Sequence, residues 1–182
     1  MRVDRIQAQA TYPLRWAILR PDQPRESVIF DGDADQESVH FGACDEAGEV
    51  CGVASMFHKG PAADAPHVLA APAHVRALLA STSAWQLRGM ATSGQARGKG
   101  VGGLLLKACL HHVATVELAV ITTDLTRDAV VPVRLSERYI FWCNARETVE
   151  GFYRRYGLVV SGSAYDVPTV GPHIFMWKIL DI

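Results

Sequence analysis

The stretch "TSGQARGKGVGGLLLKACL", residues 92–110, decides the fold because it joins a strand-like segment to a helical one through a cluster of five glycines. Glycine inside a regular element costs about 1 kcal/mol relative to alanine. A cluster of glycines therefore indicates a backbone that must approach something closely. That partner is a phosphate or another strand, unless the segment is simply a flexible turn.

The composition indicates one globular domain over residues 1–182, with 49% hydrophobic and 20% charged residues. Eighteen Lys and Arg residues stand against nineteen Asp and Glu residues, which gives a net charge of −1. Nucleic acids and anionic membranes require strongly basic faces. The charge balance therefore argues against both as partners and leaves room only for a small, local positive patch.

Four cysteines, Cys44, Cys51, Cys109 and Cys143, follow no C-x-x-C or zinc-ligand spacing. We therefore predict free thiols and no metal site. The N-terminal stretch lacks the apolar core of a signal peptide, and no run of residues is apolar enough to span a membrane. These features predict a cytoplasmic protein.

The remaining pattern predicts a mixed α/β order. Strands are expected over 85–92, 138–145, 158–167 and 173–180, and two more within 39–58 around a turn at 45–49. Helices are expected over 14–19, 73–80, after the glycine cluster, and over 146–157. The helix after the cluster has Val101, Leu104, Leu105 and Ala108 on one face. Residues 117–138 fit either a longer helix or a β-branched strand.

Two binding interpretations of the glycine cluster compete. Gly98, Gly100 and Gly103 spell the dinucleotide fingerprint G-x-G-x-x-G, and Asp124 follows at about the distance of a ribose-binding acid. However, "SGQAR" separates the first of these glycines from the strand. No Walker motif is present in the sequence.

The second interpretation takes Arg97 to Gly102 as R-x-x-G-x-G. Glycines there allow successive amide groups to face one concavity, and the following helix adds its positive end. Arg97 and Lys99 add local charge. Such a site suits two linked phosphates.

Two motifs in this order resemble the GNAT superfamily of acyl-CoA-dependent N-acyltransferases. "LRGMAT" (87–92) followed by "RGKGVGG" (97–103) is similar to the family's strand and pyrophosphate loop. "NARETVEGFYRRYGL" (144–158) resembles its next motif, which ends F-Y-x-x-x-G-[FL]. "AYDVPTVGPHIFMWK" (164–178) resembles the last hairpin of the ElaA-like branch.

This resemblance implies a single-domain α/β (α+β) fold with a central mixed, mostly antiparallel sheet flanked by helices. It also implies acetyl-CoA as co-substrate, with no metal. The implied coenzyme A contacts are Met90, Ala91 and Thr92 on the strand, Arg97, Gly98, Lys99, Gly100, Val101 and Gly102 in the loop, and Asn144 and Arg146 beyond it. The family often carries an asparagine where Arg146 stands, so Asn144 and Arg146 share that assignment.

The resemblance also implies catalytic groups. Tyr153 stands at the position from which a tyrosine commonly protonates the departing thiolate, and a phenol keeps its proton at neutral pH. Its alternative role is an aromatic on a buried helix face. The 85–92 strand offers no acidic residue as a base. His173 in the Pro-His pair is the remaining candidate base or acceptor-binding group, because histidine titrates near neutrality.

We therefore expect an N-acetyltransferase that acts on a primary amine of a small molecule or peptide, with backbone amides polarising the thioester. A non-catalytic acyl-CoA sensor and a dinucleotide-binding oxidoreductase are the alternatives. Asp31, Asp33 and Asp35 suggest attraction of a cationic amine or simply a solvated acidic loop. An exposed sheet edge would favour a homodimer.

Overall fold

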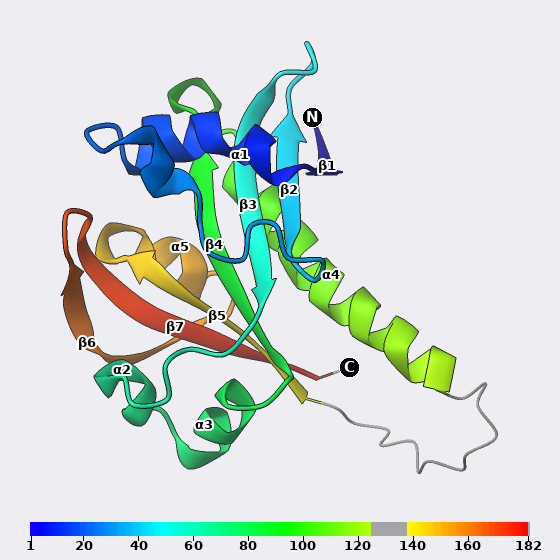
Figure 1. Ribbon diagram of the computed structural model, residues 1–182, viewed down its shortest axis with the longest axis vertical. Helices are drawn as coiled ribbons and strands as arrows, with labels where there is room; N and C mark the ends of the chain where they lie inside the picture. Colours follow the sequence, from blue (N-terminus) through cyan, green and yellow to red (C-terminus); the bar gives the residue numbers. More distant parts are fainter. Residues whose placement is uncertain (125–137, 182) are drawn as a thin grey trace.

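The protein is built on one seven-stranded sheet with the order β1-β2-β3-β4-β5-β7-β6 (Figure 1). The computed structural model describes residues 1–124 and 138–181, with only the backbone described over 116–124. The strands are β1 (Arg2–Ile6), β2 (Val39–Cys44), β3 (Val50–His58), β4 (Ala84–Thr92), β5 (Arg138–Arg146), β6 (Val159–Val167) and β7 (Gly171–Asp181). Neighbouring strands are antiparallel except for the parallel pair β4 and β5. The predicted mixed, mostly antiparallel sheet is confirmed.

Helices cover both faces of this sheet. They are α1 (Ala8–Leu14), which continues as the π-helical η1 (Arg15–Leu19), α2 (Pro66–Leu69), α3 (Ala73–Leu79), α4 (Val101–Asp124) and α5 (Glu150–Arg154). Short 3₁₀ turns are η2 (Arg25–Val28), η3 (Gly94–Ala96) and η4 (Glu147–Val149). In Figure 1, α1 crosses in front of the sheet and α4 runs behind it.

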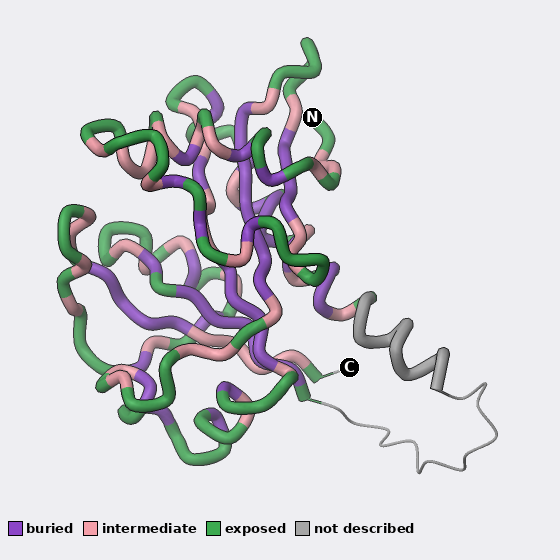
Figure 2. The backbone as a smooth tube through the Cα atoms, in the orientation of Figure 1, coloured by how far each residue is buried: buried purple, intermediate pink, exposed green. Residues whose placement is uncertain are grey.

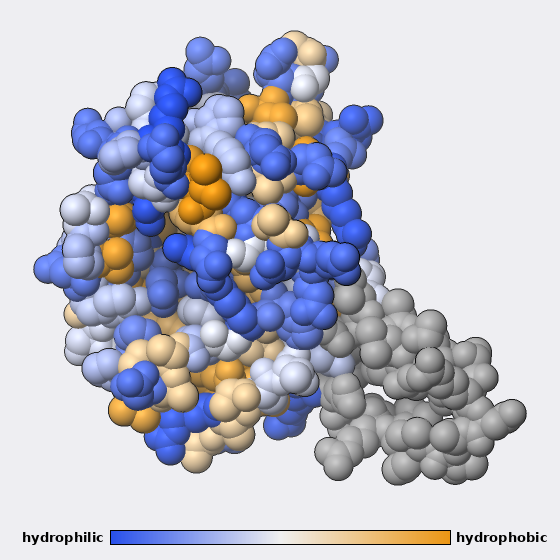
Figure 3. Space-filling model, in the orientation of Figure 1, coloured by the Kyte–Doolittle hydropathy of each residue, from blue (hydrophilic) through white to orange (hydrophobic). Residues whose placement is uncertain are grey.

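The alternation of strand residues divides the core into two layers. On the α4 face, Leu87, Phe141 and Met176 are buried in one cluster with Leu105. On the opposite face, Trp142 and other strand residues pack with Val75 and Leu79 of α3. Figure 2 shows the buried residues concentrated along the central strands. On the face drawn in Figure 3, hydrophilic residues predominate and apolar ones form small patches.

Strands β4 and β5 pair only where they begin. Ala84, Trp85 and Gln86 face Ile140, Phe141 and Trp142, and beyond these residues the two strands diverge (Figure 1). The carboxyl half of β4 therefore has a strand neighbour on one edge only, and its divergence from β5 leaves an opening in the strand pairing of the sheet.

A β-bulge distorts β4 beside this opening. Val53 of β3 faces Ala91, whereas Ser55 faces Arg88, so β4 contains one residue more than its partner over this stretch. Gly89 takes a left-handed φ of +65°, a conformation that favours glycine. The extra residue changes the direction in which Met90 and the end of the strand point.

Several predicted boundaries were wrong. The first helix begins at Ala8 and includes Pro13, whereas we placed its start at Leu14. Neither β1 nor the four-residue α2 was predicted, because both are short and lack a clear apolar pattern. The helix expected over 146–157 is a 3₁₀ turn followed by the five-residue α5. The hairpin turn at 45–49 is confirmed by the bond from the Asp45 amide to the Glu49 carbonyl.

The buried face of α4 also differs from the prediction. Leu104 is 41% exposed, whereas Leu105, Leu106 and Cys109 are fully buried beside Val101. The helix is therefore rotated relative to the predicted stripe. The helix extends to Asp124, so the first part of the 117–138 stretch is helical and not a strand. Residues 125–137 lie outside the described residues.

All four cysteines are free, as predicted. Among the described residues, no helix has both the length and the apolar character needed to cross a membrane. Within the same residues, no three His, Cys, Asp or Glu side chains are arranged to hold a metal ion.

Candidate active site

The glycine loop lies between the end of β4 and the start of α4. The first intrahelical bond runs from the Leu104 amide to the Gly100 carbonyl, at 3.1 Å. The amides of Val101, Gly102 and Gly103 precede it and have no acceptor within the described part of the chain. Together they form a group of donors at the positive end of a helix of 24 residues.

The loop needs glycine for its conformation, not for packing. Gly98 and Gly100 have left-handed φ angles of +75° and +80°, and a Cβ at either position would meet nothing within 4 Å. Arg97 and Lys99 are exposed and form no ion pair with any described residue. An open, left-handed loop with free amides and two free cations fits a diphosphate.

The amides of β4 alternate between its two edges. The Ser93 amide donates to the Cys51 carbonyl of β3 at 2.9 Å. Alternation then directs the Ala91 amide toward β3 as well. The amide of Thr92 faces the other edge, where β4 and β5 diverge, so this predicted strand contact is available to a ligand. Met90 lies in the bulge, where the regular alternation is interrupted.

Tyr153 lies on the α4 side of the opening. Its phenol donates to the Met90 sulfur at 3.6 Å, and the residue is only 7% exposed. Burial raises the pKa of the Tyr153 phenol well above its usual value near 10. A Cβ on Gly102 would lie 3.4 Å from Cε of Met90. The structure therefore brings Met90, Gly102 and Tyr153 together from three separate elements.

His173, Asn144 and Arg146 lie elsewhere, on the opposite face of the sheet. Arg146 and His173 are paired across β5 and β7. Arg146 donates to the Leu19 carbonyl at 2.6 Å, and Asn144 is exposed. His173 Nδ1 lies 2.7 Å from the Gly171 carbonyl, which can only accept. In the neutral ring the proton is then on Nδ1, and the lone pair of Nε2 faces away from this bond.

The acidic loop does not form the solvated cluster that we considered. Asp33 is 7% exposed and accepts two hydrogen bonds from Arg15, at 2.7 and 3.0 Å. Asp31 and Asp35 remain exposed. Because Arg15 neutralises Asp33, that residue is not a free acid for a cationic amine.

Arg88 and Arg20, which also lie on this face, were not predicted as site residues, whereas Arg146 was. The guanidinium of Arg88 on β4 lies 4.0 Å from the Phe30 ring centre, and that of Arg20 lies 5.5 Å from it. The strand alternation placed Arg88 opposite to the buried Leu87, which was a usable signal. Phe30 and Arg20 come from loop segments that carry no such periodicity.

Comparisons with known proteins give one consistent result. The sequence model of the GNAT family of acetyltransferases matches residues 7–133. An uncharacterized N-acetyltransferase of Bacillus subtilis, YitI, is 29% identical over 180 residues, which cover 99% of this chain and 97% of the relative.

Solved structures show the same fold. Escherichia coli ElaA superposes with a TM-score of 0.62 at 15% identity, over 98% of this chain and 99% of ElaA. An aminoglycoside 6′-N-acetyltransferase complexed with coenzyme A gives 0.61 at 11% identity, over 98% of this chain and 97% of that protein. The dinucleotide alternative is wrong. Asp124 ends a helix, whereas the fingerprint's ribose-binding acid follows the next strand.

Proposed function

The chain belongs to the GNAT family of acetyltransferases and is an acetyl-transferring enzyme, and from this premise we propose how it works. It transfers an acetyl group from acetyl-CoA to a primary amine of a small molecule or peptide by direct attack. The observation that carries this proposal is that the amides of Gly98, Gly100, Val101, Gly102 and Gly103 have no acceptor among the described residues. Enzymes of this family use acetyl-CoA, which supplies an activated thioester.

The glycine loop would hold the diphosphate of the co-substrate. Amides of Gly98, Gly100, Val101 and Gly102 would donate to its oxygens, with Arg97 and Lys99 adding charge. Open space over Gly98 and Gly100 lets a phosphate approach the backbone closely. One solved structure with the same fold is described as a complex with coenzyme A, which supports the assignment.

The end of β4 would orient and polarise the thioester. The amide of Thr92, which faces the edge of β4 without a strand partner, and the amide of Met90 in the bulge would donate to an acyl carbonyl without breaking the sheet. Holding two reactants in line can remove roughly 7–11 kcal/mol from a barrier. Positioning by this strand would therefore supply much of the rate acceleration.

Tyr153 would act as the general acid. Its raised pKa keeps the phenol protonated, and its hydroxyl contacts the side-chain sulfur of Met90, a residue of the strand that would hold the thioester. The proton would pass from the phenol oxygen to the leaving thiolate. Nε2 of His173, on the other face, would accept the proton of the attacking amine or contact the acceptor.

Two glycines with matched geometry test the loop. Gly100 has a φ of +80° and Gly48, in the β2–β3 turn, a φ of +84°, and both face open space. Gly100→Ala and Gly48→Ala should therefore lose similar stability, about 1 kcal/mol each. By calorimetry, Gly100→Ala should weaken coenzyme A binding roughly tenfold, whereas Gly48→Ala should bind like the unmodified protein. Equal affinities in both variants would remove the loop from the site.

Turnover is tested separately. Thiol release from acetyl-CoA should require an added primary amine and should saturate with it. If the protein binds coenzyme A but no amine in a broad panel releases thiol, the transfer reaction is wrong while the binding site stands.

A further inference from the structure

Three guanidinium groups gather around one aromatic ring beside the bulge in β4. Those of Arg88, Arg15 and Arg20 lie 4.0, 4.2 and 5.5 Å from the centre of Phe30. A Cβ on Gly89 would lie 2.8 Å from Cε2 of Phe30, so the ring packs directly on the bulge. The cluster is therefore adjacent to Met90 in both sequence and space.

These guanidinium groups differ in how many hydrogen bonds and ion pairs they form with the protein. Arg15 is fully buried and bonds to Asp33, Ser55 and the Val28 carbonyl. Arg88 is half-buried and forms no hydrogen bond or ion pair with any described residue. Its planar fork of donors is thus available to a ligand.

Arg20 and Arg146 extend the positive charge across the opening. Both are half-buried, and among the described residues their side chains donate hydrogen bonds to backbone carbonyls, that of Ser27 for Arg20 and that of Leu19 for Arg146. Burial and the neighbouring Arg146 lower the pKa of Arg20, and burial and Arg20 lower that of Arg88. Each of these arginines is therefore close enough to its neighbour to interact with it electrostatically, while Asp31 and Asp33 act on the pKa of Arg88 in the opposite direction.

The arginine cluster lies on the face of the sheet opposite to the proposed general acid, Tyr153. Arg88 and Arg146 project from the sheet face opposite to Leu87 and Tyr153, which belong to the α4 cluster. Tyr153 and the glycine loop would hold the leaving thiol on the α4 side. An attacking amine would approach from the other side, where Arg88, Arg146 and His173 lie.

On the basis of the proposed function, we infer that the acceptor is an amine bearing an anionic group, a carboxylate or a phosphate, which Arg88 binds with Arg20 and Arg146 beside it. Carboxylates and phosphates match the guanidinium fork in bidentate geometry. Asp33 is held by Arg15, and Asp31, whose charge also acts on Arg88, is exposed and forms no ion pair with it, so neither carboxylate occupies the guanidinium fork of Arg88. The groove of about 460 Å³ that Asp33 and Asp35 help to line involves β1 and the start of β2, not β4.

Matched acceptor pairs test this inference. Amino acids would be compared with their amides, and aminoalkyl phosphates with the corresponding amino alcohols, as kcat/KM from thiol release. The unmodified enzyme should prefer the anionic member of a carboxylate or a phosphate pair about ten- to a hundredfold. The pair with the larger preference identifies the anion.

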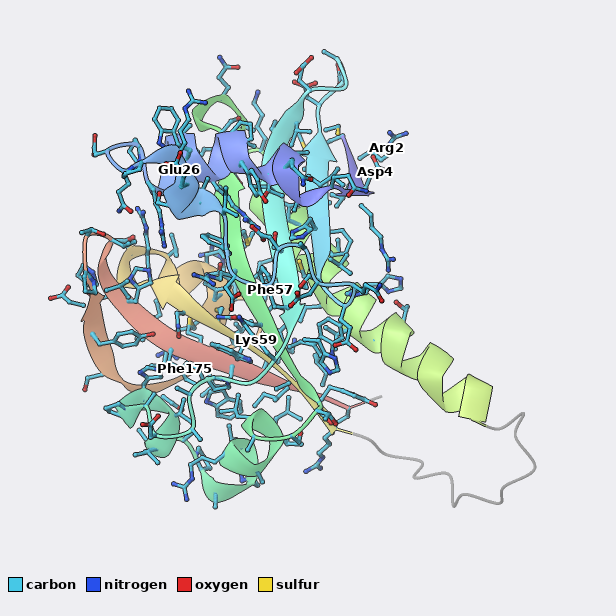
Figure 4. All side chains as sticks on the ribbon, in the orientation of Figure 1. Arg2, Asp4, Glu26, Phe57, Lys59 and Phe175 are labelled. Carbon is cyan, nitrogen blue, oxygen red and sulfur yellow. The ribbon has the colours of Figure 1, made fainter. Side chains whose placement is uncertain are left out.

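Variants locate the contact. Arg88→Met should reduce the ratio of kcat/KM between the anionic and neutral acceptors to about one, without changing the affinity for coenzyme A. Arg88→Lys should keep part of the preference for the anionic acceptor. Arg2→Met is the control, since Arg2 is exposed on the edge strand β1 and pairs with Asp4 (Figure 4). It should keep the full preference.

Binding provides a readout without turnover. With coenzyme A present, calorimetry should show that an N-acetyl amino acid or N-acetylaminoalkyl phosphate binds more tightly than its uncharged analogue. Equal binding, a preference for neutral amines, or a preference unchanged in Arg88→Met would overturn the inference and leave the proposed acetyl transfer intact. Loss of coenzyme A affinity in Arg88→Met would assign the arginine to the co-substrate instead. Failure to bind coenzyme A at all would instead contradict the proposed function.

Discussion

Arg15 and Arg88 stack on the same phenylalanine, at 4.2 and 4.0 Å from its ring centre, yet their surroundings are opposite. Arg15 is fully buried and meets a carboxylate, a hydroxyl and a carbonyl. Arg88 is half-buried and meets only the ring among the described residues. Arg15 connects the N-terminal helical segment to the sheet through its hydrogen bond to Ser55. The N–H donors of Arg88 remain available to a ligand.

The difference between these two arginines shows that one charged side chain can stabilise the fold while a neighbouring one remains available to bind a ligand. A buried charge is tolerated only when its partners are supplied by the protein. A half-buried charge without partners can be satisfied by a ligand. The two arginines should accordingly respond to substitution in different measurements.

The largest expected effect is on stability at Arg15. Arg15→Met leaves Asp33 buried without its partner, which should cost about 3–5 kcal/mol of unfolding free energy. Arg88→Met loses a cation–π contact, worth about 0.5–1 kcal/mol. Urea denaturation of both variants measures this. Similar losses of unfolding free energy in the two variants would contradict the proposed difference between Arg15 and Arg88.

A second expected effect is on catalysis at Tyr153, which is buried like Arg15 but whose hydroxyl has only the Met90 sulfur as a hydrogen-bond partner among the described residues. Tyr153→Phe should lower kcat about a hundredfold, because a general acid typically contributes 10²–10⁴. Its affinity for coenzyme A should not change.

Tyr156→Phe is the matched control for Tyr153. Tyr156 is on the turn after α5, and its hydroxyl lies against Gly103. Its kcat should remain within about twofold of the unmodified enzyme. If Tyr153→Phe behaved the same way, Tyr153 would be a core aromatic and nothing more.

A smaller effect concerns pH and the network around Arg15. His40 bonds to Ser55 and to the Asp33 carbonyl, and burial lowers its pKa below 6.5. The unfolded chain therefore binds more protons than the folded one as the pH falls below about 6.5. Stability should decrease over that range.

The same sign applies to His112, whose pKa burial lowers to about 4. His40→Gln should therefore reduce the loss of stability between pH 7 and pH 5 without removing it. His74→Gln, at an exposed position of α3, should leave the slope unchanged. An equal slope in all three proteins would show that the Arg15 network does not sense pH.

Much of the fold could be predicted because local signals marked it. Alternating residues identified β4, the apolar run over 139–143 marks β5, and the turn at 45–49 identified the hairpin of β2 and β3. The face of α4 was misjudged because Leu104 and Leu106 both fit a helical stripe, and only packing against the sheet decides between them. The start of α1 was missed because Pro13 lies inside that helix.

The candidate site likewise has one part that could be predicted from the sequence and another that could not. The loop from Arg97 to Gly102 is contiguous in sequence, so its pattern was visible. The arginine cluster joins Phe30, Arg20, Arg88 and Arg146, which only the folded chain brings close. Likewise, no sequence pattern indicated that Asp33 would be neutralised by Arg15.

The most direct test of the whole account is a crystal structure with coenzyme A bound. We predict diphosphate oxygens within about 3 Å of the amide nitrogens of Gly98, Gly100, Val101 and Gly102, with the coenzyme A sulfur near Met90 and beside the Tyr153 hydroxyl. A diphosphate bound elsewhere, with those amides facing solvent or bonded only to protein groups, would contradict it.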